Sequence, residues 1–312
     1  MLTTQRQIPT ATRSTGSSGP AEGSWTTLVW AAVLMLVWLL VLCGAVRGGT
    51  IYVDSRQGND RYDGRHATVT GFDSGPVRTL AAALRLVDSG DSIELANNGT
   101  PYYGSLTLYG ARHSGTFNRP FEIRGNGATL SGAKPVGLGC WRRATDDLWR
   151  VTPIGKTYFQ LVSNGKAVPE VASDRSTAAM PMVAEGEWCA WRGAVYYHAQ
   201  TGVDPDRLGL SLSDANVGIT LVDVENVVIR DLTLQHFRID GINAHDRCRR
   251  IELVNITLEE NGRTGLAVGG TSRVVVRGSK IARNREASVL ITELGEARLE
   301  ATETDVAPTV VE

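Results

Sequence analysis

The feature that most constrains this chain is a repeat of three copies between residues 226 and 293. Each copy opens with a run rich in β-branched residues and continues, after a polar turn, into a second apolar run. The opening runs are residues 226–234, 250–258 and 273–281, and the second runs are residues 241–244, 265–268 and 288–291. The equivalent positions Val227, Ile251 and Val274 lie 24 and then 23 residues apart. A repeat this short, with no helical period, predicts a solenoid of stacked β-strands.

Alternation within the copies predicts which side chains point into the solenoid, because successive residues of a strand face opposite sides. The predicted core positions are Val227, Ile229, Ile251, Leu253, Val274 and Val276 in a first ladder, and Ile242, Leu266 and Val289 in a second. Asn261 and Asn284 share one turn position. Asparagine tolerates the left-handed backbone that such a turn needs, and stacked asparagines can hydrogen-bond along the axis.

This pattern resembles the right-handed parallel β-helix of the pectate-lyase-like superfamily. The resemblance implies an all-β fold with polysaccharide as the substrate or ligand. A short helix with Leu80, Leu84 and Val87 on one face, leading into Gly90-Asp91-Ser92-Ile93, is similar to the N-terminal cap of many β-helix proteins. Its expected role is to cover the apolar side chains and free strand edges of the first rung.

Between residues 134 and 214 the rhythm of the repeat breaks, which predicts a β-rich insert on the side of the solenoid. The insert contains Trp141, Trp149, Trp188 and Trp191, which could either form its core or present rings on which sugars stack. Cys140 and Cys189 could form a disulfide after export, and Cys248 would then remain a free thiol.

The N-terminal part has a different character. Residues 1–26 are rich in Ser, Thr, Gly and Pro and are expected to be a disordered tail. An apolar run without a charge follows at residues 28–46, which is long enough to span a bilayer. We therefore expect residues 27–47 to be a transmembrane helix, with a cleaved signal peptide as the alternative because small residues follow Cys43. Residues 48–312 are then the β-helix domain, and its export is inferred from the resemblance.

The charge distribution bounds the partners. With 32 basic and 33 acidic residues, the chain gives no indication of a nucleic-acid partner. The outward positions of the first strand carry Arg230, Arg250, Glu252, Arg273 and Arg277. We expect a mildly basic face there, which either binds an anionic polysaccharide or is only a solvated sheet surface.

Candidate catalytic residues recur at the turn after the third strand. Asp223, Asp246 and Glu293 share one position, and His245 stands beside Asp246. Rungs stack about 4.8 Å apart, so Asp223 and Asp246 are expected to raise the pKa of one of the two carboxyls, as in an acid–base pair. A separation of about 5 Å suits a retaining glycosidase. A lyase would instead need a base and a cation such as Ca²⁺, which the acidic turn could hold.

Two classes of function stay open on the sequence alone. One is a membrane-anchored or secreted lyase or glycoside hydrolase at the cell envelope. The other is a non-catalytic β-helix used for glycan binding, adhesion or surface architecture. The Gly-His-Gly run of polygalacturonases and the His-rich signature of pectate lyases are missing from this sequence. At residues 297–311 the repeat is degraded, which predicts a frayed last rung that pairs end to end with a second copy, or a shortened β-helix.

Overall fold

The computed structural model describes residues 48–155, 158–173 and 179–311 of the chain. The tail and the membrane segment predicted for residues 1–47 lie outside the described residues. Within the described part, no helix is both long enough and apolar enough to cross a membrane.

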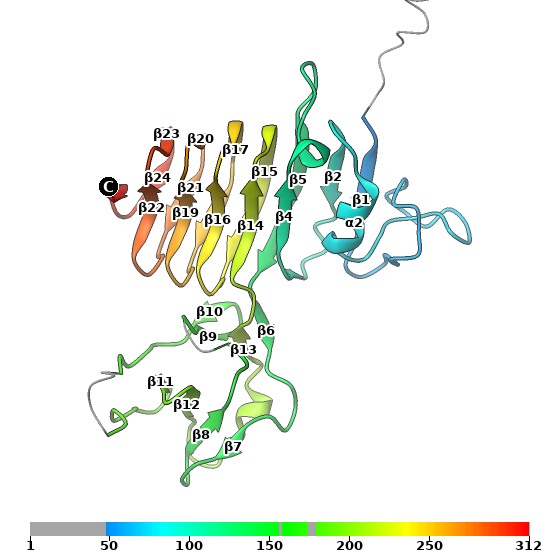
Figure 1. Ribbon diagram of the computed structural model, residues 1–312. Coiled ribbons are helices and arrows are strands. Elements are labelled where there is room, and N and C mark those ends of the chain that lie inside the picture. Colours follow the sequence, from blue (N-terminus) through cyan, green and yellow to red (C-terminus); the bar gives the residue numbers. More distant parts are fainter. Residues whose placement is uncertain (1–47, 156–157, 174–178, 312) are drawn as a thin grey trace, which may run out of the picture. The chain divides into compact units, whose positions relative to one another are not determined.

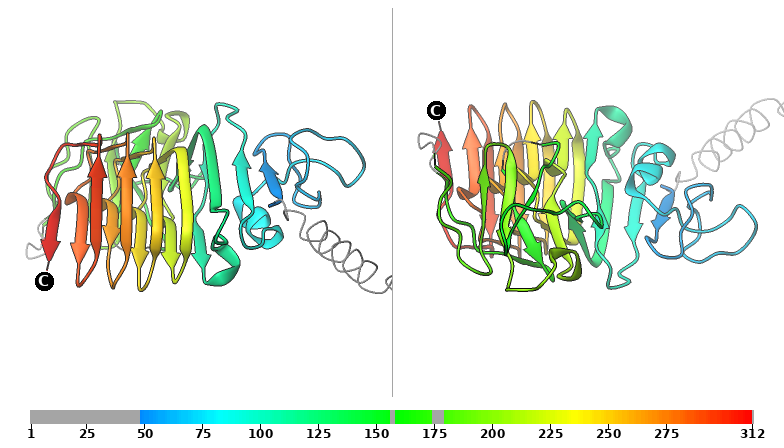
Figure 2. Two further views of the ribbon diagram at one scale, coloured as in Figure 1. Left: turned by 90° about the horizontal axis from the view of Figure 1, so that it is seen from above. Right: turned by 90° about the horizontal axis from the view of Figure 1, so that it is seen from below.

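Two parallel sheets form the solenoid (Figure 1). The first, called sheet A, runs in the order β1 (Thr50–Val53), β2 (Ser92–Leu95), β5 (Phe121–Ser131), β15 (Glu225–Gln235), β17 (Arg249–Val254), β20 (Arg273–Arg277) and β23 (Glu296–Glu300). It continues through β3 (Tyr102–Tyr103), β18 (Thr257–Glu259), β21 (Lys280–Ala282) and β24 (Glu303–Thr304). The second, called sheet B, runs in the order β4 (Leu106–Tyr109), β14 (Val217–Val222), β16 (Asp240–His245), β19 (Thr264–Val268), β22 (Ala287–Thr292) and β25 (Thr309–Val311). Figure 2 shows the strands lying side by side along one axis.

The observed register confirms the predicted ladders. Val227 pairs with Ile251 and Ile251 with Val274, while Ile242 pairs with Leu266 and Leu266 with Val289. All nine predicted core side chains are buried in one continuous cluster. Stacking identical positions of successive rungs removes their apolar surface from water, and that burial is the main stabilising term of such a fold.

The asparagine ladder is also present. The fully buried Asn261 accepts a hydrogen bond from the Phe237 backbone N–H (3.1 Å) and donates its side-chain N–H to Asn284 Oδ1 (2.9 Å). The expected left-handed backbone lies one residue earlier, at His236, Glu260 and Arg283, whose φ angles are 60°, 52° and 56°. The asparagines are therefore selected by their amides, which bond along the axis, and not by their backbone conformation.

The first rung is covered at its free edge. A loop over residues 55–77 bonds to β1, with the Tyr52 N–H donating to Gly64 O (2.7 Å) and the Asp54 N–H donating to Val77 O (2.8 Å). Helix α2 (Leu80–Leu86) follows, and the Thr79 side chain caps it by accepting from the Ala82 N–H. Leu80 and Val87 are buried in the core of the solenoid, as expected for a capping helix.

The insert folds into two antiparallel sheets between β6 (Ala133–Pro135) and β13 (Leu210–Ser213). One sheet has the order β10 (Lys166–Ala167), β9 (Leu161–Ser163), β13 and β6. The other has the order β11 (Trp188–Trp191), β12 (Ala194–His198), β8 (Leu148–Val151) and β7 (Arg142–Arg143). Trp141 and Trp188 are buried in the core of the insert, so neither is a sugar platform. Cys140 and Cys189 are both free thiols.

The last rung is not frayed, contrary to the expectation. β23 pairs with β20, β24 pairs with β21, and β25 pairs with β22. The third strand of the last rung begins after a shorter turn. Thr309 pairs with Leu290, an offset of 19 residues, whereas the pairings from β14 to β22 have offsets of 23 or 24. Asp305 holds the shortened turn by accepting from Ser288 Oγ. Val310 of β25 remains 64% exposed, and end-to-end pairing of two copies stays a prediction.

Candidate functional site

The turn after each sheet B strand has a left-handed backbone at one shared position. Asp223, Asp246, Gly270 and Glu293 occupy it, with φ angles of 52°, 67°, 63° and 57°. The pairing of β14 with β16, of β16 with β19 and of β19 with β22 brings the four turns into line. Aspartate adopts this conformation more readily than most residues. Backbone geometry is therefore one sufficient reason for aspartate at this position, and a catalytic role for these acids stays a prediction.

Asp223 is held by an arginine from the next turn. Arg247 Nε lies 2.8 Å from Asp223 Oδ1. The hydrogen bond from Arg247 lowers the pKa of Asp223, and the charges of Arg247 and His245 act in the same direction. This shift is opposite to the one expected for the acid of an acid–base pair. Asp223 is therefore a carboxylate held in an ion pair at neutral pH.

His245 and Asp246 open onto a cleft of about 250 Å³ on the outer side of sheet B. Asp246 Oδ2 lies 3.3 Å from His245 Nδ1, and both side chains are about half exposed. The cleft is also lined by Asn243, Arg263, Thr292 and Glu293. The carboxylate lies beside Nδ1, and Nε2 is the ring nitrogen on the opposite side of the imidazole.

A buried carboxylate, that of Asp240, holds two side chains that line this cleft. The Asp240 side chain is only 1% exposed, and it accepts from Arg263 Nε (2.9 Å) and Nη2 (2.6 Å). Asn243 Nδ2 donates to the same carboxylate (3.0 Å). The hydrogen bonds with Asp240 also raise the pKa of Arg263. Bidentate pairing fixes the guanidinium plane, so Arg263 and Asn243 are held in place before any ligand arrives.

Sequence reasoning did not single out Asp240, Asn243 or Arg263, although a signal was available. Asp240 occupies a position that carries Val217, Thr264 and Ala287 in the neighbouring rungs, and its buried carboxylate needs a cation. The partner could not be read from the repeat, because it lies 23 residues away and off the strand alignment.

The five predicted substrate-binding residues lie on sheet A, away from the strand that carries His245. Each arginine among them is ion-paired with a carboxylate of its own or a neighbouring rung. The pairs are Arg230 with Glu122 (2.7 Å), Arg250 with Glu225 (3.1 Å), Arg273 with Glu296 (3.0 Å), and Arg277 with Glu252 (2.6 Å) and Glu300 (2.8 Å). Carboxylates therefore balance the arginines of this surface, and a substrate-binding role for these five residues stays a prediction. Surface pairs of this kind each contribute little to stability.

The described residues contain no group of three or more His, Cys, Asp or Glu side chains arranged to hold a metal ion. The acids of the turn have other partners. Asp223 is paired with Arg247, Asp246 lies against His245, and Glu293 accepts from the Gly270 N–H (2.6 Å). A Ca²⁺ site at this turn would require those contacts to rearrange.

Comparison with known proteins bears on the fold. No protein-family model and no curated protein matches the chain. A solved structure titled "Glycoside hydrolase" is similar, with a TM-score of 0.56, 15% identity, and coverage of 79% of this chain and 68% of that one. Two more distant matches are a complex of XylC with xylose (TM-score 0.42, 11% identity, coverage 83% and 65%) and the pectate lyase Pel9A (TM-score 0.42, 12% identity, coverage 85% and 52%). The parallel sheets, the rung register and the first of these similarities establish that this chain has a parallel β-helix fold, which is the fold that the resemblance implied.

Proposed function

We propose that the protein binds a glycan along the outer side of sheet B, on a surface called here the polar face: Tyr109, Asn243, His245, Asp246 and Arg263. The observation that carries the proposal is one row across three neighbouring strands, in which Tyr109 pairs with Val222 and Val222 with His245. Tyr109 is 62% exposed. An exposed aromatic ring two strands from a polar cleft, about 10 Å away at strand spacing, suits the apolar face of one sugar and the hydroxyls of the next.

The polar groups of this face are suited to hydroxyls. Arg263 and Asn243 are fixed by the buried Asp240, so binding costs little side-chain entropy. Arg263 can only donate, while the amide of Asn243 both donates and accepts, which matches the dual character of a sugar hydroxyl. Arg263 of this face is already paired with Asp240, and the nearby Arg247 is paired with Asp223. We therefore propose a neutral glycan and not a polyuronate.

The similarity in fold to a structure titled "Glycoside hydrolase" is compatible with this proposal. Shared fold alone does not transfer an activity, because sites differ between proteins of one fold. The local arrangement of the polar face is what favours binding.

Binding is tested with the full-length chain and a panel of immobilised neutral polysaccharides. Tyr109→Ala is expected to reduce retention at least tenfold, because stacking area is lost. The matched control is Tyr103→Ala, which removes a comparably exposed tyrosine (45%) from sheet A and should leave retention unchanged. Equal retention of the two variants would remove the polar face from consideration.

Cleavage is the second candidate, favoured by one observation. His245 Nδ1 lies 3.3 Å from Asp246 Oδ2 at the cleft, and an imidazole beside a carboxylate is suited to act as a general base. In this scheme Asp246 and His245 are the catalytic residues, and Asp223 acts only through its ion pair with Arg247. Asp246→Asn should then abolish turnover while the melting temperature changes little. New reducing ends would indicate hydrolysis, and ultraviolet absorbance from an unsaturated product would indicate elimination. Unaltered turnover in Asp246→Asn would leave a non-catalytic binding or adhesion protein.

The apolar run at residues 28–46 supports a location at the cell envelope, with the β-helix exported and held by an uncleaved anchor. Alkaline extraction of membranes from expressing cells tests the anchor. The full-length chain should stay with the membrane, whereas release of a product beginning after about residue 47 would indicate a cleaved signal peptide.

A further inference from the structure

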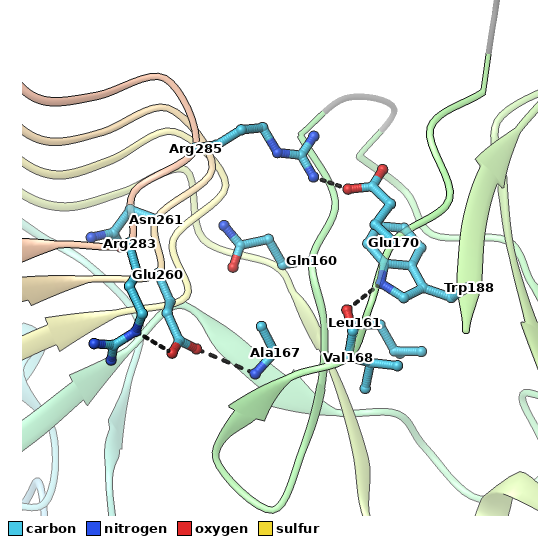
Figure 3. Close-up of a pocket in the computed structure, with 10 residues that line it drawn as sticks. All are labelled: Gln160, Leu161, Ala167, Val168, Glu170, Trp188, Glu260, Asn261, Arg283 and Arg285. Carbon is cyan, nitrogen blue, oxygen red and sulfur yellow. Dashed lines mark hydrogen bonds and ion pairs between the residues drawn. The ribbon is translucent and has the colours of Figure 1, made fainter. Parts of the chain in front are cut away.

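A second cavity, of about 240 Å³, lies between the insert and the turns that follow β18 and β21 (Figure 3). The insert contributes Gln160, Leu161 and Val168 to its wall, and the turns contribute Glu260 and Arg283. This cavity shares no lining residue with the cleft of the polar face. Pockets at the junction of two structural units are frequent ligand sites.

The side chain of Gln160 points from the insert toward these turns (Figure 3). The residue is only 9% exposed. Its backbone oxygen accepts from the Ser213 N–H (3.0 Å), but its side-chain amide has no hydrogen-bond partner among the residues that the structure describes. The amide faces the cavity, where a bound molecule can reach its N–H and C=O groups. Such a group, facing a cavity, indicates a polar ligand.

The charged groups around this amide neutralise one another. Arg283 donates to Glu260 Oε1 (3.1 Å) and also pairs with Glu259. Arg285 pairs with Glu170 of the insert. Each charged side chain that the structure describes in the cavity wall is therefore paired, while the wall still offers hydrogen-bond donors and acceptors. Such a wall favours an uncharged ligand rich in hydroxyls.

The insert side of the cavity is apolar. Leu161 and Val168 line it together with Trp188, whose Nε1–H already donates to Val168 O (2.9 Å). A polar wall opposite an apolar wall suits a molecule with hydroxyls at its edge and C–H groups on its face. The volume of about 240 Å³ is sufficient for one ring of that kind.

We propose that this cavity binds a single neutral sugar ring, with the Gln160 amide as its central hydrogen-bonding group. The ring would bridge the insert and the β-helix, which are joined here by the Ala167 N–H donating to Glu260 (3.2 Å). The proposal does not rest on glycan binding at the polar face, since the two sites share no residue.

The test titrates the full-length chain with glucose, galactose and xylose, and with glucuronate as a charged comparator. At least one neutral sugar should bind with a Kd below about 10 mM, and glucuronate should bind at least tenfold more weakly. Gln160→Leu should weaken sugar binding at least tenfold, because it removes the amide that would bond to the hydroxyls. Its melting temperature should match that of the parent, which shows that the variant is folded. Gln200→Leu, an exposed glutamine of the same insert, is the matched control and should bind like the parent.

A second measurement locates the sugar. In the parent protein, bound sugar should slow amide exchange at residues 160–168 and 283–285. Exchange that slows elsewhere, or sugar binding that survives Gln160→Leu, overturns the proposal, as does failure of every neutral sugar to bind. Tyr109→Ala separates the two sites: it should reduce retention on polysaccharide at least tenfold and leave the binding of the single sugar unchanged.

Discussion

Removing Arg263 tests whether the buried Asp240 holds the polar face together. Arg263→Leu keeps the aliphatic part of the side chain but leaves the Asp240 carboxylate, 1% exposed, with Asn243 as its remaining partner. Breaking a buried ion pair from one side costs about 3–5 kcal/mol. Because Arg263 itself is 29% exposed, solvent reaches part of the site, and we expect the lower end, about 3 kcal/mol.

The assay is urea unfolding followed by tryptophan fluorescence, with the slope of the transition compared between variants. The double variant Asp240→Val with Arg263→Leu is the control for charge burial. Valine is the residue at the equivalent position of the preceding rung, Val217, so it fits the column. We expect the double variant to regain most of the lost stability, since replacing both partners of a buried pair by apolar residues is close to neutral.

Two results would refute this reasoning. A loss below about 1 kcal/mol in Arg263→Leu would mean that the pair behaves as an exposed one. A double variant no more stable than Arg263→Leu would mean that Asp240 is not the origin of the cost. Glycan retention should fall in both variants, because both lose the fixed guanidinium.

Four further predictions concern the fold. Leu253→Asp should yield no soluble folded protein, because it places an unpaired carboxylate in the fully buried ladder; a parental melting curve would mean that the register is wrong. Asn261→Ala should lower the free energy of unfolding by about 2–4 kcal/mol, since the buried Phe237 N–H loses its acceptor. The control Asn118→Ala, at an exposed position, should change it by less than about 0.5 kcal/mol in the same urea assay. Burial lowers the pKa of His236 below 6.5, so the unfolded chain binds the proton more tightly than the folded chain does. The free energy of unfolding should therefore fall as the pH drops from 6.5 toward the folded pKa. The urea midpoint of His236→Asn should depend less on pH than that of the parent. Light scattering should detect end-to-end dimers of the full-length chain that Val310→Lys disrupts, and a parent that remains monomeric at high concentration contradicts this.

The sequence by itself determined the solenoid. Its 23- to 24-residue spacing and period-2 alternation decide which side chains point inward, and Val227, Ile251 and Val274 stack as that pattern requires. The recurrence of Asp223, Asp246 and Glu293 at one turn was equally visible, because it follows from the same period. These features are local, since each depends on residues within one rung and on the repeat of that rung.

Contacts between rungs and with the insert were decided only by the tertiary structure. The arginine row looked basic in the sequence, yet Arg277 lies between Glu252 and Glu300, which are 25 and 23 residues away. Asp240 forms an ion pair with Arg263, and Gln160 lines a cavity together with residues of a distant turn. Alternation states whether a side chain faces in or out. It does not state which long side chain bends toward which neighbour, and that choice depends on the charges and shapes that stacking brings within a few ångströms.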